Sequence, residues 1–222
     1  MTSFAKKLRL YRQNRAFYRE QRAGSGYAFI HINKCGGTSI ERTLDLYKLH
    51  DTAQKRIKHI GRARWDAMYT FSVVRHPYSR VCSLYEFRVK TNQTGLGDRP
   101  VDLDEWVRLV FEERDPAYRN KPLMFAPCFE WLSDDDGTIM IDEWFRLEEL
   151  DSHWPHIMRK TGARELARHN STSSFNELRA LERLSPQSVA TIDHVFARDF
   201  ETFGYNRAES ITQPAGDVAS AP

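Results

Sequence analysis

The sequence predicts an α/β fold with a mainly parallel central sheet flanked by helices. Two stretches carry this prediction. Residues 27–32 form a short apolar run rich in strand formers, followed by a glycine loop and a helical pattern. Residues 69–74 repeat the same order, with a turn at Arg75 and a helix that starts at Pro77. Strand, loop and helix in succession are the units of parallel sheets, so we expect the two strands to share one sheet.

The composition sets the class of protein. The 222 residues are 41% apolar and 28% charged, which is enough for a core of ordinary size. No run of 18 apolar residues occurs, and the N-terminus lacks the apolar segment of a signal peptide. The three cysteines, an odd number without a Cys-x-x-Cys pair, argue against a disulfide framework and a zinc site. We therefore expect a cytoplasmic protein in a reducing compartment.

Residues 1–26 are expected to form a basic N-terminal arm. Residues 4–22 show a helical pattern with Phe4, Leu8, Tyr11 and Tyr18 on one stripe and basic side chains elsewhere. Two interpretations remain open. The arm is either a solvated extension that frays, or a helix that makes a weak contact with an anionic membrane surface.

Residues 27–206 are expected to form the main domain. After the first strand, a helix follows the glycine loop at 38–49. The basic segment 55–62 lacks clear periodicity and is expected to be a loop or a short helix. After the second strand, the helical pattern continues from Pro77 to residue 90.

The second half of the domain has weaker patterns. Residues 91–100 have the composition of a loop that could act as a lid or line an acceptor site, and a helical stripe resumes at 103–111. Asp136 and Gly137 predict a turn between a helix-like segment at 125–132 and a strand-like segment at 138–141.

The last helix has clear ends. Ser185 is a good N-cap with Pro186 after it, and Gly204 ends the apolar stripe. Residues 207–222 are expected to be a disordered tail.

The formal net charge of +3 is unevenly distributed. Residues 1–26 carry +6, residues 27–90 carry +7, and the remaining chain carries −10. Positive charge therefore gathers in the arm and around the two strand, loop and helix units. A protein that binds duplex nucleic acid is usually basic along a whole face. The distribution predicts one site for an anionic ligand and argues against a nucleic-acid partner.

The first loop has the residues of an anion site. Gly36 and Gly37 let the backbone approach an anion, Thr38 and Ser39 offer hydroxyls at the start of a helix, and Lys34 supplies a positive charge. The loop is not a Walker A motif, because the lysine precedes the glycines and no Gly-Lys-Ser/Thr follows. We expect an anion site without a metal ion.

The second loop adds another cationic group. Arg75 at the end of a strand can present two donors to a phosphate, and Ser83 lies two turns into the following helix. The second strand ends in this arginine, where a Walker B strand would place an aspartate for magnesium. Either loop alone is only moderately specific, but their order and separation of about forty residues make the pair informative.

Together the two loops resemble those of the sulfotransferases that use 3′-phosphoadenosine 5′-phosphosulfate, in the branch of carbohydrate 2-O-sulfotransferases and related bacterial proteins. Phe29-Ile-His-Ile-Asn-Lys34-Cys-Gly-Gly-Thr-Ser39 is similar to the 5′-phosphosulfate loop, with Asn33 where many members have proline. Val73-Val-Arg75-His-Pro-Tyr-Ser-Arg80-Val-Cys-Ser83 is similar to the 3′-phosphate motif. Residues 144–150 and 199–205 are similar to later landmarks of the branch.

The resemblance covers residues 27–206 and implies a sulfotransferase domain of P-loop-NTPase-like architecture. It implies that the enzyme moves a sulfuryl group from the nucleotide donor to a hydroxyl, on a carbohydrate in this branch. The implied contacts of the 5′-phosphosulfate are Lys34, Cys35, Gly36, Gly37, Thr38 and Ser39. Those of the 3′-phosphate are Arg75 and Ser83.

The reaction requires a base for the acceptor hydroxyl. We choose His59, because related bacterial members resemble this chain in placing a histidine in the segment before the second motif strand. The basic residues around His59 could also hold an anionic acceptor. The alternatives are His50, His31 and Glu86, although His31 is expected to be a packed strand residue.

Two other functions remain open from the sequence. One is a binding module for an acidic polymer, without catalysis, that uses the arm and residues 55–64. The other is a P-loop nucleotide kinase or ATPase, against which the missing Gly-Lys-Ser/Thr speaks.

Overall fold

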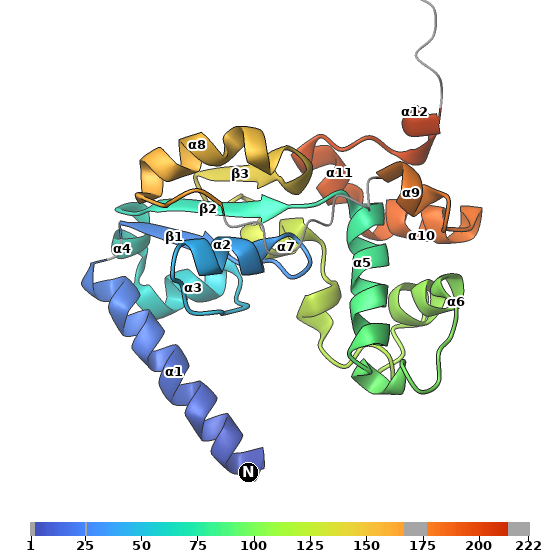
Figure 1. Cartoon of the computed structure of the whole chain (residues 1–222), viewed down its shortest axis with the longest axis horizontal. Helices are drawn as coiled ribbons and strands as arrows, with labels where there is room; N and C mark the ends of the chain where they lie inside the picture. Colours follow the sequence, from blue (N-terminus) through green and yellow to red (C-terminus); the bar gives the residue numbers. More distant parts are fainter. Residues whose placement is uncertain (1–2, 25, 167–176, 213–222) are drawn as a thin grey trace, which may run out of the picture. The chain divides into compact units, whose positions relative to one another are not determined.

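A computed structural model of the chain describes residues 3–24, 26–166 and 177–212 (Figure 1). The predicted disordered tail lies partly outside this range. Within the tail, the structure describes one short helix, α12 (Ala208–Thr212), and residues 213–222 lie outside the described residues.

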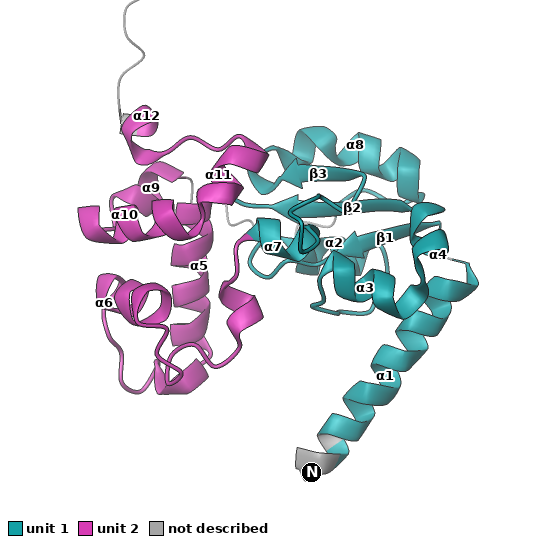
Figure 2. Ribbon diagram, turned by 180° about the vertical axis from the view of Figure 1, so that it is seen from behind, with its two compact units in different colours: residues 1–75, 128–171 teal, residues 76–127, 172–222 magenta. Residues whose placement is uncertain are grey.

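The chain divides into two compact units (Figure 2). Residues 1–75 and 128–171 form the first unit, and residues 76–127 and 172–222 form the second.

The first unit contains the sheet. It has three strands, β1 (Tyr27–Ile30), β2 (Tyr69–Val74) and β3 (Glu143–Arg146), in the order β1-β2-β3. Both pairs are parallel, with Phe29 opposite Phe71 and Val73 opposite Phe145. The predicted parallel sheet flanked by helices is therefore confirmed. The carboxyl ends of the strands lie at one edge, where loops of such sheets bind ligands.

One face of the sheet is packed against α2 (Gly37–Thr43) and α8 (Leu150–Thr161). The strands contribute Phe29, Phe71, Val73 and Phe145 to this core. The helices contribute Ile40, Leu150, Trp154 and Ile157, and Leu44 joins them just after α2. Full burial of a large apolar side chain contributes about 1.5–3 kcal/mol, so this core holds both helices firmly on the sheet.

Helix α1 (Ser3–Ala23) packs against α3 (Ala53–Ile60) only along its second half. Phe17 and Tyr18 are buried, whereas Leu8 and Tyr11 of the predicted stripe are 40% and 58% exposed. In Figure 1 the first half of α1 extends away from the rest of its unit. The predicted helix is confirmed, but only part of its apolar stripe is buried.

Two elements of the first unit differ from the sequence prediction. The helix expected at 38–49 ends at Thr43, because Asp45 adopts a left-handed conformation with φ of 50°. The basic segment, expected to be a loop or a short helix, agrees with the second option, because it forms the short helix α3 and the start of α4 (Arg62–Asp66). The strand-like residues 138–141 make only an isolated bridge between Ser133 and Ile139, and the third strand is β3. The unit also contains α7 (Cys128–Leu132).

The second unit is helical in the described residues. It contains α5 (Pro77–Lys90), α6 (Leu103–Val107), α9 (Glu177–Leu181), α10 (Pro186–Val195), α11 (Ala197–Phe203) and α12. Trp106, Phe111, Phe125 and Phe196 form its aromatic core. A wider π-helical turn (Arg108–Glu112) follows α6.

The expected helix ends in this unit are confirmed. The Ser185 hydroxyl accepts a hydrogen bond from the Ser188 backbone N–H, and Gly204 ends α11 with φ of 65°. The single helix expected between them is broken in two at Phe196. In the described part of the chain, every helix is too short or too polar to cross a membrane.

Candidate anion site at the glycine loop

The glycine loop joins β1 to α2 through a tight turn at residues 33–36. Lys34 and Gly36 both adopt left-handed conformations, with φ of 66° and 76°. Gly36 takes this conformation without steric cost, and a Cβ there would lie 2.6 Å from Leu147 Cδ1. Lys34 pays a conformational cost on the order of 1 kcal/mol, which the surrounding structure must offset. The sequence pattern therefore forms a defined turn at the carboxyl edge of the sheet.

Gly37 is required for a different reason. A Cβ on Gly37 would lie 2.2 Å from Cδ2 of His31, so the imidazole ring lies directly against the helix backbone. The His31 ring is buried, and its Nδ1 lies 2.7 Å from Oε1 of Glu41, at an ion-pair distance without the alignment of a hydrogen bond. The expectation that His31 is a packed residue agrees with this burial, but the ring packs under the loop.

His50 lies next to His31. Its Nδ1 is 3.1 Å from the His31 carbonyl oxygen, and the two ring centroids are 4.3 Å apart. Since a carbonyl only accepts hydrogen bonds, this contact assigns the proton to Nδ1 and the lone pair to Nε2. Burial, and then the neighbouring His31, lower the pKa of His50 to about 4. His50 is therefore neutral at pH 7, as a proton acceptor must be.

Arg75 follows β2 and lies against the same loop. Its guanidinium is buried, with the residue 2% exposed, and Nη1 donates a hydrogen bond of 3.3 Å to the Lys34 carbonyl oxygen. Two of the predicted site residues are thus brought together within the first unit. Ser83 lies on α5 in the second unit and is 7% exposed, and its part in holding the 3′-phosphate remains a prediction.

The other loop residues differ in what they can offer a ligand. Cys35 is 1% exposed, and its Sγ lies 3.9 Å from Cys128 Sγ, so its thiol packs inside the unit and does not face a ligand. Thr38 and Ser39 are partly exposed in the first turn of α2.

His59 lies elsewhere in the first unit. It is exposed and stacks on Tyr18 of α1, with centroids 4.1 Å apart and an interplanar angle of 19°. It is the penultimate residue of α3, which leads into α4, and α4 lies beside the amino-terminal ends of β1 and β2 (Figures 1 and 2). The glycine loop follows the carboxyl end of β1. The contacts of His59 are thus with α1, and none of its described contacts involves the glycine loop.

Glu86, another alternative base, is on α5 of the second unit. Its Oε1 lies 2.7 Å from Nη1 of Arg183, so its charge is already paired with a cation.

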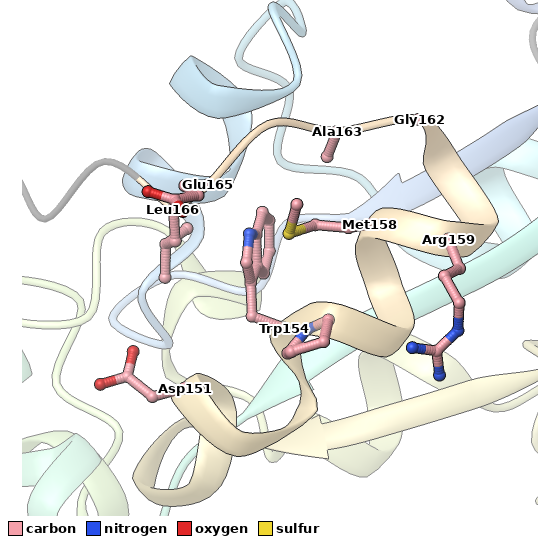
Figure 3. A pocket seen from close by; sticks show the side chains of 9 residues that line it. Asp151, Trp154, Met158, Arg159, Gly162, Ala163, Glu165 and Leu166 are labelled. Atoms are coloured by element: carbon pink, nitrogen blue, oxygen red, sulfur yellow. The ribbon is translucent and has the colours of Figure 1, made fainter.

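A cavity lies along α8 (Figure 3). Its volume is about 670 Å³, and Trp154 and Met158 form its apolar wall beside the charged Asp151, Arg159 and Glu165. None of the predicted site residues lines this cavity.

Comparison with known proteins identifies the family to which the sequence is similar. The sequence model described as the sulfotransferase family matches residues 25–206, which is most of the chain. The search of curated proteins and the search of solved structures gave no significant match.

Proposed function

The chain belongs to the sulfotransferase family, and on that premise we propose that it transfers a sulfuryl group from 3′-phosphoadenosine 5′-phosphosulfate to a hydroxyl of a carbohydrate. The observation that carries the proposal is the contact of Arg75 with the loop that holds Lys34. The choice of donor rests on the resemblance of both loops to the donor motifs. The choice of a carbohydrate rests on the resemblance to the 2-O-sulfotransferase branch.

The proposed donor site uses the glycine loop for the 5′ end of the nucleotide. The backbone N–H groups of residues 35–38 and the hydroxyls of Thr38 and Ser39 face the phosphosulfate, and Lys34 adds a full positive charge. The Ser39 N–H donates to the Gly36 carbonyl instead. Arg75 and Ser83 hold the 3′-phosphate at the other end of the nucleotide. Both ends of the donor carry negative charge, and Lys34 and Arg75 are the cations that complement it.

The proposed reaction is an in-line displacement at sulfur. The acceptor oxygen forms a bond to sulfur while the bond from sulfur to the phosphate oxygen breaks, and 3′-phosphoadenosine 5′-phosphate leaves. Negative charge builds on that phosphate oxygen in the transition state, as in phosphoryl transfer. Lys34 stabilises this charge as it develops, so the proposed chemistry needs no metal ion.

The acceptor hydroxyl must give its proton to a base. The contacts of the described residues support His50 for this role more than His59. His50 adjoins His31 beneath Gly37, is neutral at pH 7 and has its Nε2 lone pair available for a proton. His59 instead stacks on Tyr18.

Variants separate the two candidates. His50→Ala is expected to lower kcat by roughly 100-fold or more, the usual effect of removing a general base. His59→Ala is expected to change kcat by no more than about twofold. The reverse result would return the role to His59.

The function is tested by incubating the protein with labelled donor and a mixed library of glycans and small alcohols, followed by mass spectrometry of the products. Binding of 3′-phosphoadenosine 5′-phosphate is measured separately by calorimetry. We expect binding in the micromolar range and sulfation of a sugar hydroxyl. Arg62→Ala is a matched control, because Arg62 is an exposed arginine of the same unit paired with Asp66. Absence of both binding and transfer would refute the proposal.

One observation favours a second function, binding of an acidic polymer. Arg12, Arg15, Arg19 and Arg22 are all exposed on α1, and their spacing of three, four and three places them on one side of the helix. A polyanion that follows this row would bind with an affinity that falls steeply with salt.

The test is titration of the full chain with a sulfated polysaccharide at two salt concentrations, with and without 3′-phosphoadenosine 5′-phosphate. Polymer binding that ignores the nucleotide and is lost when the four arginines are changed to glutamine would support a separate binding function. The same titration with vesicles that contain anionic lipid tests whether the arm contacts a membrane surface instead.

A further inference from the structure

His31 touches three parts of the proposed site at once. Its ring lies against Gly37, its Nδ1 faces Glu41, and its carbonyl oxygen contacts His50. We infer that His31 is a positioning residue for the proposed reaction: its imidazole, held by Glu41, supports the glycine loop at Gly37 and packs against the ring of His50, while its backbone carbonyl accepts from Nδ1 of His50. The inference rests on the proposed function, which gives the loop and His50 their roles.

The contact with Gly37 couples His31 to the loop. Three ring atoms of His31 lie within 2.7 Å of the place where a Cβ on Gly37 would be. The backbone of Gly37 is not in the left-handed region, so the ring alone excludes a larger residue there. A displacement of the ring would therefore be felt at the first residue of α2.

Glu41 prevents that displacement. The side chains of His31 and Glu41 are only 4% and 6% exposed, and they face each other at 2.7 Å. A carboxylate in such a buried place requires a polar or cationic partner. Rotation of the His31 ring would remove that partner, so Glu41 holds the ring in its place between the loop and His50.

The contact with His50 orients the proposed base. The His31 carbonyl accepts from Nδ1 of His50, and the two rings are 4.3 Å apart with a tilt of 54°. The charged and titratable groups that act on His50 are His31, Glu41 and Lys48. On its other side, His50 meets the edge of the Trp131 ring on α7. The lone pair on Nε2 is thus held in one direction.

A double-variant experiment tests the coupling to the loop. Gly37→Ala should weaken binding of 3′-phosphoadenosine 5′-phosphate by about tenfold or more, because the new methyl group collides with His31. In the double variant with His31→Ala, the methyl group has room, and affinity should return to that of His31→Ala alone. Gly36→Ala is the control. His31→Ala should not rescue it, since its conflicts are the φ of 76° and Leu147.

Histidine NMR titration tests the coupling to His50 without any need for activity. In the native protein His50 should titrate near pH 4, and in His31→Ala its pKa should rise toward the ordinary value of about 6.5. His31→Ala should lower kcat by about tenfold or more and raise the donor KM by a smaller factor of about threefold, because the loop loses the ring beneath Gly37. His31→Gln, which keeps a polar group for Glu41, should recover part of kcat.

The outcomes are distinguishable. A purely structural role for His31 would lower thermal stability but leave the titration of His50 unchanged, and that result would overturn the inference. Failure of His31→Ala to rescue Gly37→Ala would also count against it. If His31→Ala does not fold, the NMR titration of His50 is measured in His31→Gln instead. If the native chain binds no nucleotide, the proposed function fails, and with it the role of His31 in that reaction; the His50 titration then still decides whether His31 holds the ring of His50.

Discussion

Nη1 of Arg75 donates a hydrogen bond of 3.3 Å to the carbonyl oxygen of Lys34. The contact joins the residue after β2 to the loop after β1, and these two strands are neighbours in the sheet. Because Arg75 is almost fully buried, bulk water does not compete with its guanidinium for the Lys34 carbonyl oxygen. The loop conformation and the charge beside it are therefore linked.

Arg75→Lys tests this link. A lysine keeps the charge but lacks the planar donor group, so it cannot bond the Lys34 carbonyl and a phosphate together. We expect binding of 3′-phosphoadenosine 5′-phosphate to weaken by roughly tenfold in Arg75→Lys and more in Arg75→Ala. Calorimetry at constant salt measures both. Equal affinity in the native protein and Arg75→Ala would exclude a role in donor binding.

Two substitutions of Lys34 separate charge from backbone conformation. Lys34→Gly removes the charge but accepts the φ of 66°, whereas Lys34→Ala removes the charge and keeps the strain. Both should lower kcat by about 10²- to 10³-fold, because each loses the cation beside the leaving phosphate. Lys34→Gly should be as stable as the native protein within about 1 kcal/mol. A native kcat in either variant would remove Lys34 from the reaction.

The buried ion pair of Asp51 and Arg56 lies next to His50 in the chain, and we expect it to contribute strongly to the free energy of unfolding. Asp51 accepts hydrogen bonds from Nε and Nη2 of Arg56 at 2.8 and 2.6 Å, and both residues are almost fully buried. Asp51→Asn leaves the Arg56 charge uncompensated and should lower the free energy of unfolding by about 3–5 kcal/mol.

The matched control for this pair is Asp66→Asn. Asp66 pairs with Arg62, but the two side chains are 50% and 65% exposed, so the loss should be about 0–1 kcal/mol. Urea unfolding at pH 7 compares the two variants. If both variants lost a similar amount of unfolding free energy, burial would not make the Asp51 pair more important for stability than the exposed Asp66 pair.

The lowered pKa of His50 predicts a pH dependence of stability. Between about pH 6.5 and pH 4 the unfolded chain binds a proton on His50 that the folded chain does not, so stability falls as the pH falls. His50 should contribute on the order of 1–3 kcal/mol to this loss. Urea unfolding of native protein and His50→Gln at pH 7 and pH 4.5 measures it. The loss should be smaller in His50→Gln, and equal losses would contradict the buried, neutral state of His50.

Local patterns were enough to predict several elements. The strand at 69–74, the helix that starts at Pro77 and the caps at Ser185 and Gly204 depend on neighbouring residues, and the structure confirms them. The third strand was missed. Apolar and polar residues do not alternate clearly along its four residues. They form a strand because their backbone pairs with that of β2.

Some residues of the candidate site were also predictable from local patterns, whereas others were not. Lys34 and the glycines were found because their spacing is a local signal, and Arg75 because it follows a predicted strand. The arrangement of His31, Glu41 and His50 was missed, since no spacing in the sequence relates a residue just after a strand, a residue on a helix and a residue in a loop. His50 was named as an alternative base, but nothing in the sequence ranked it above His59.

The amino-acid sequence by itself determined the strand, loop and helix units, the cationic loop residues and the family, because each is written in residues close along the chain. Only the tertiary structure decided which histidine adjoins the glycine loop and which stacks on α1. The physical reason is that packing brings distant residues together, and the contacts of an imidazole fix its burial, tautomer and pKa.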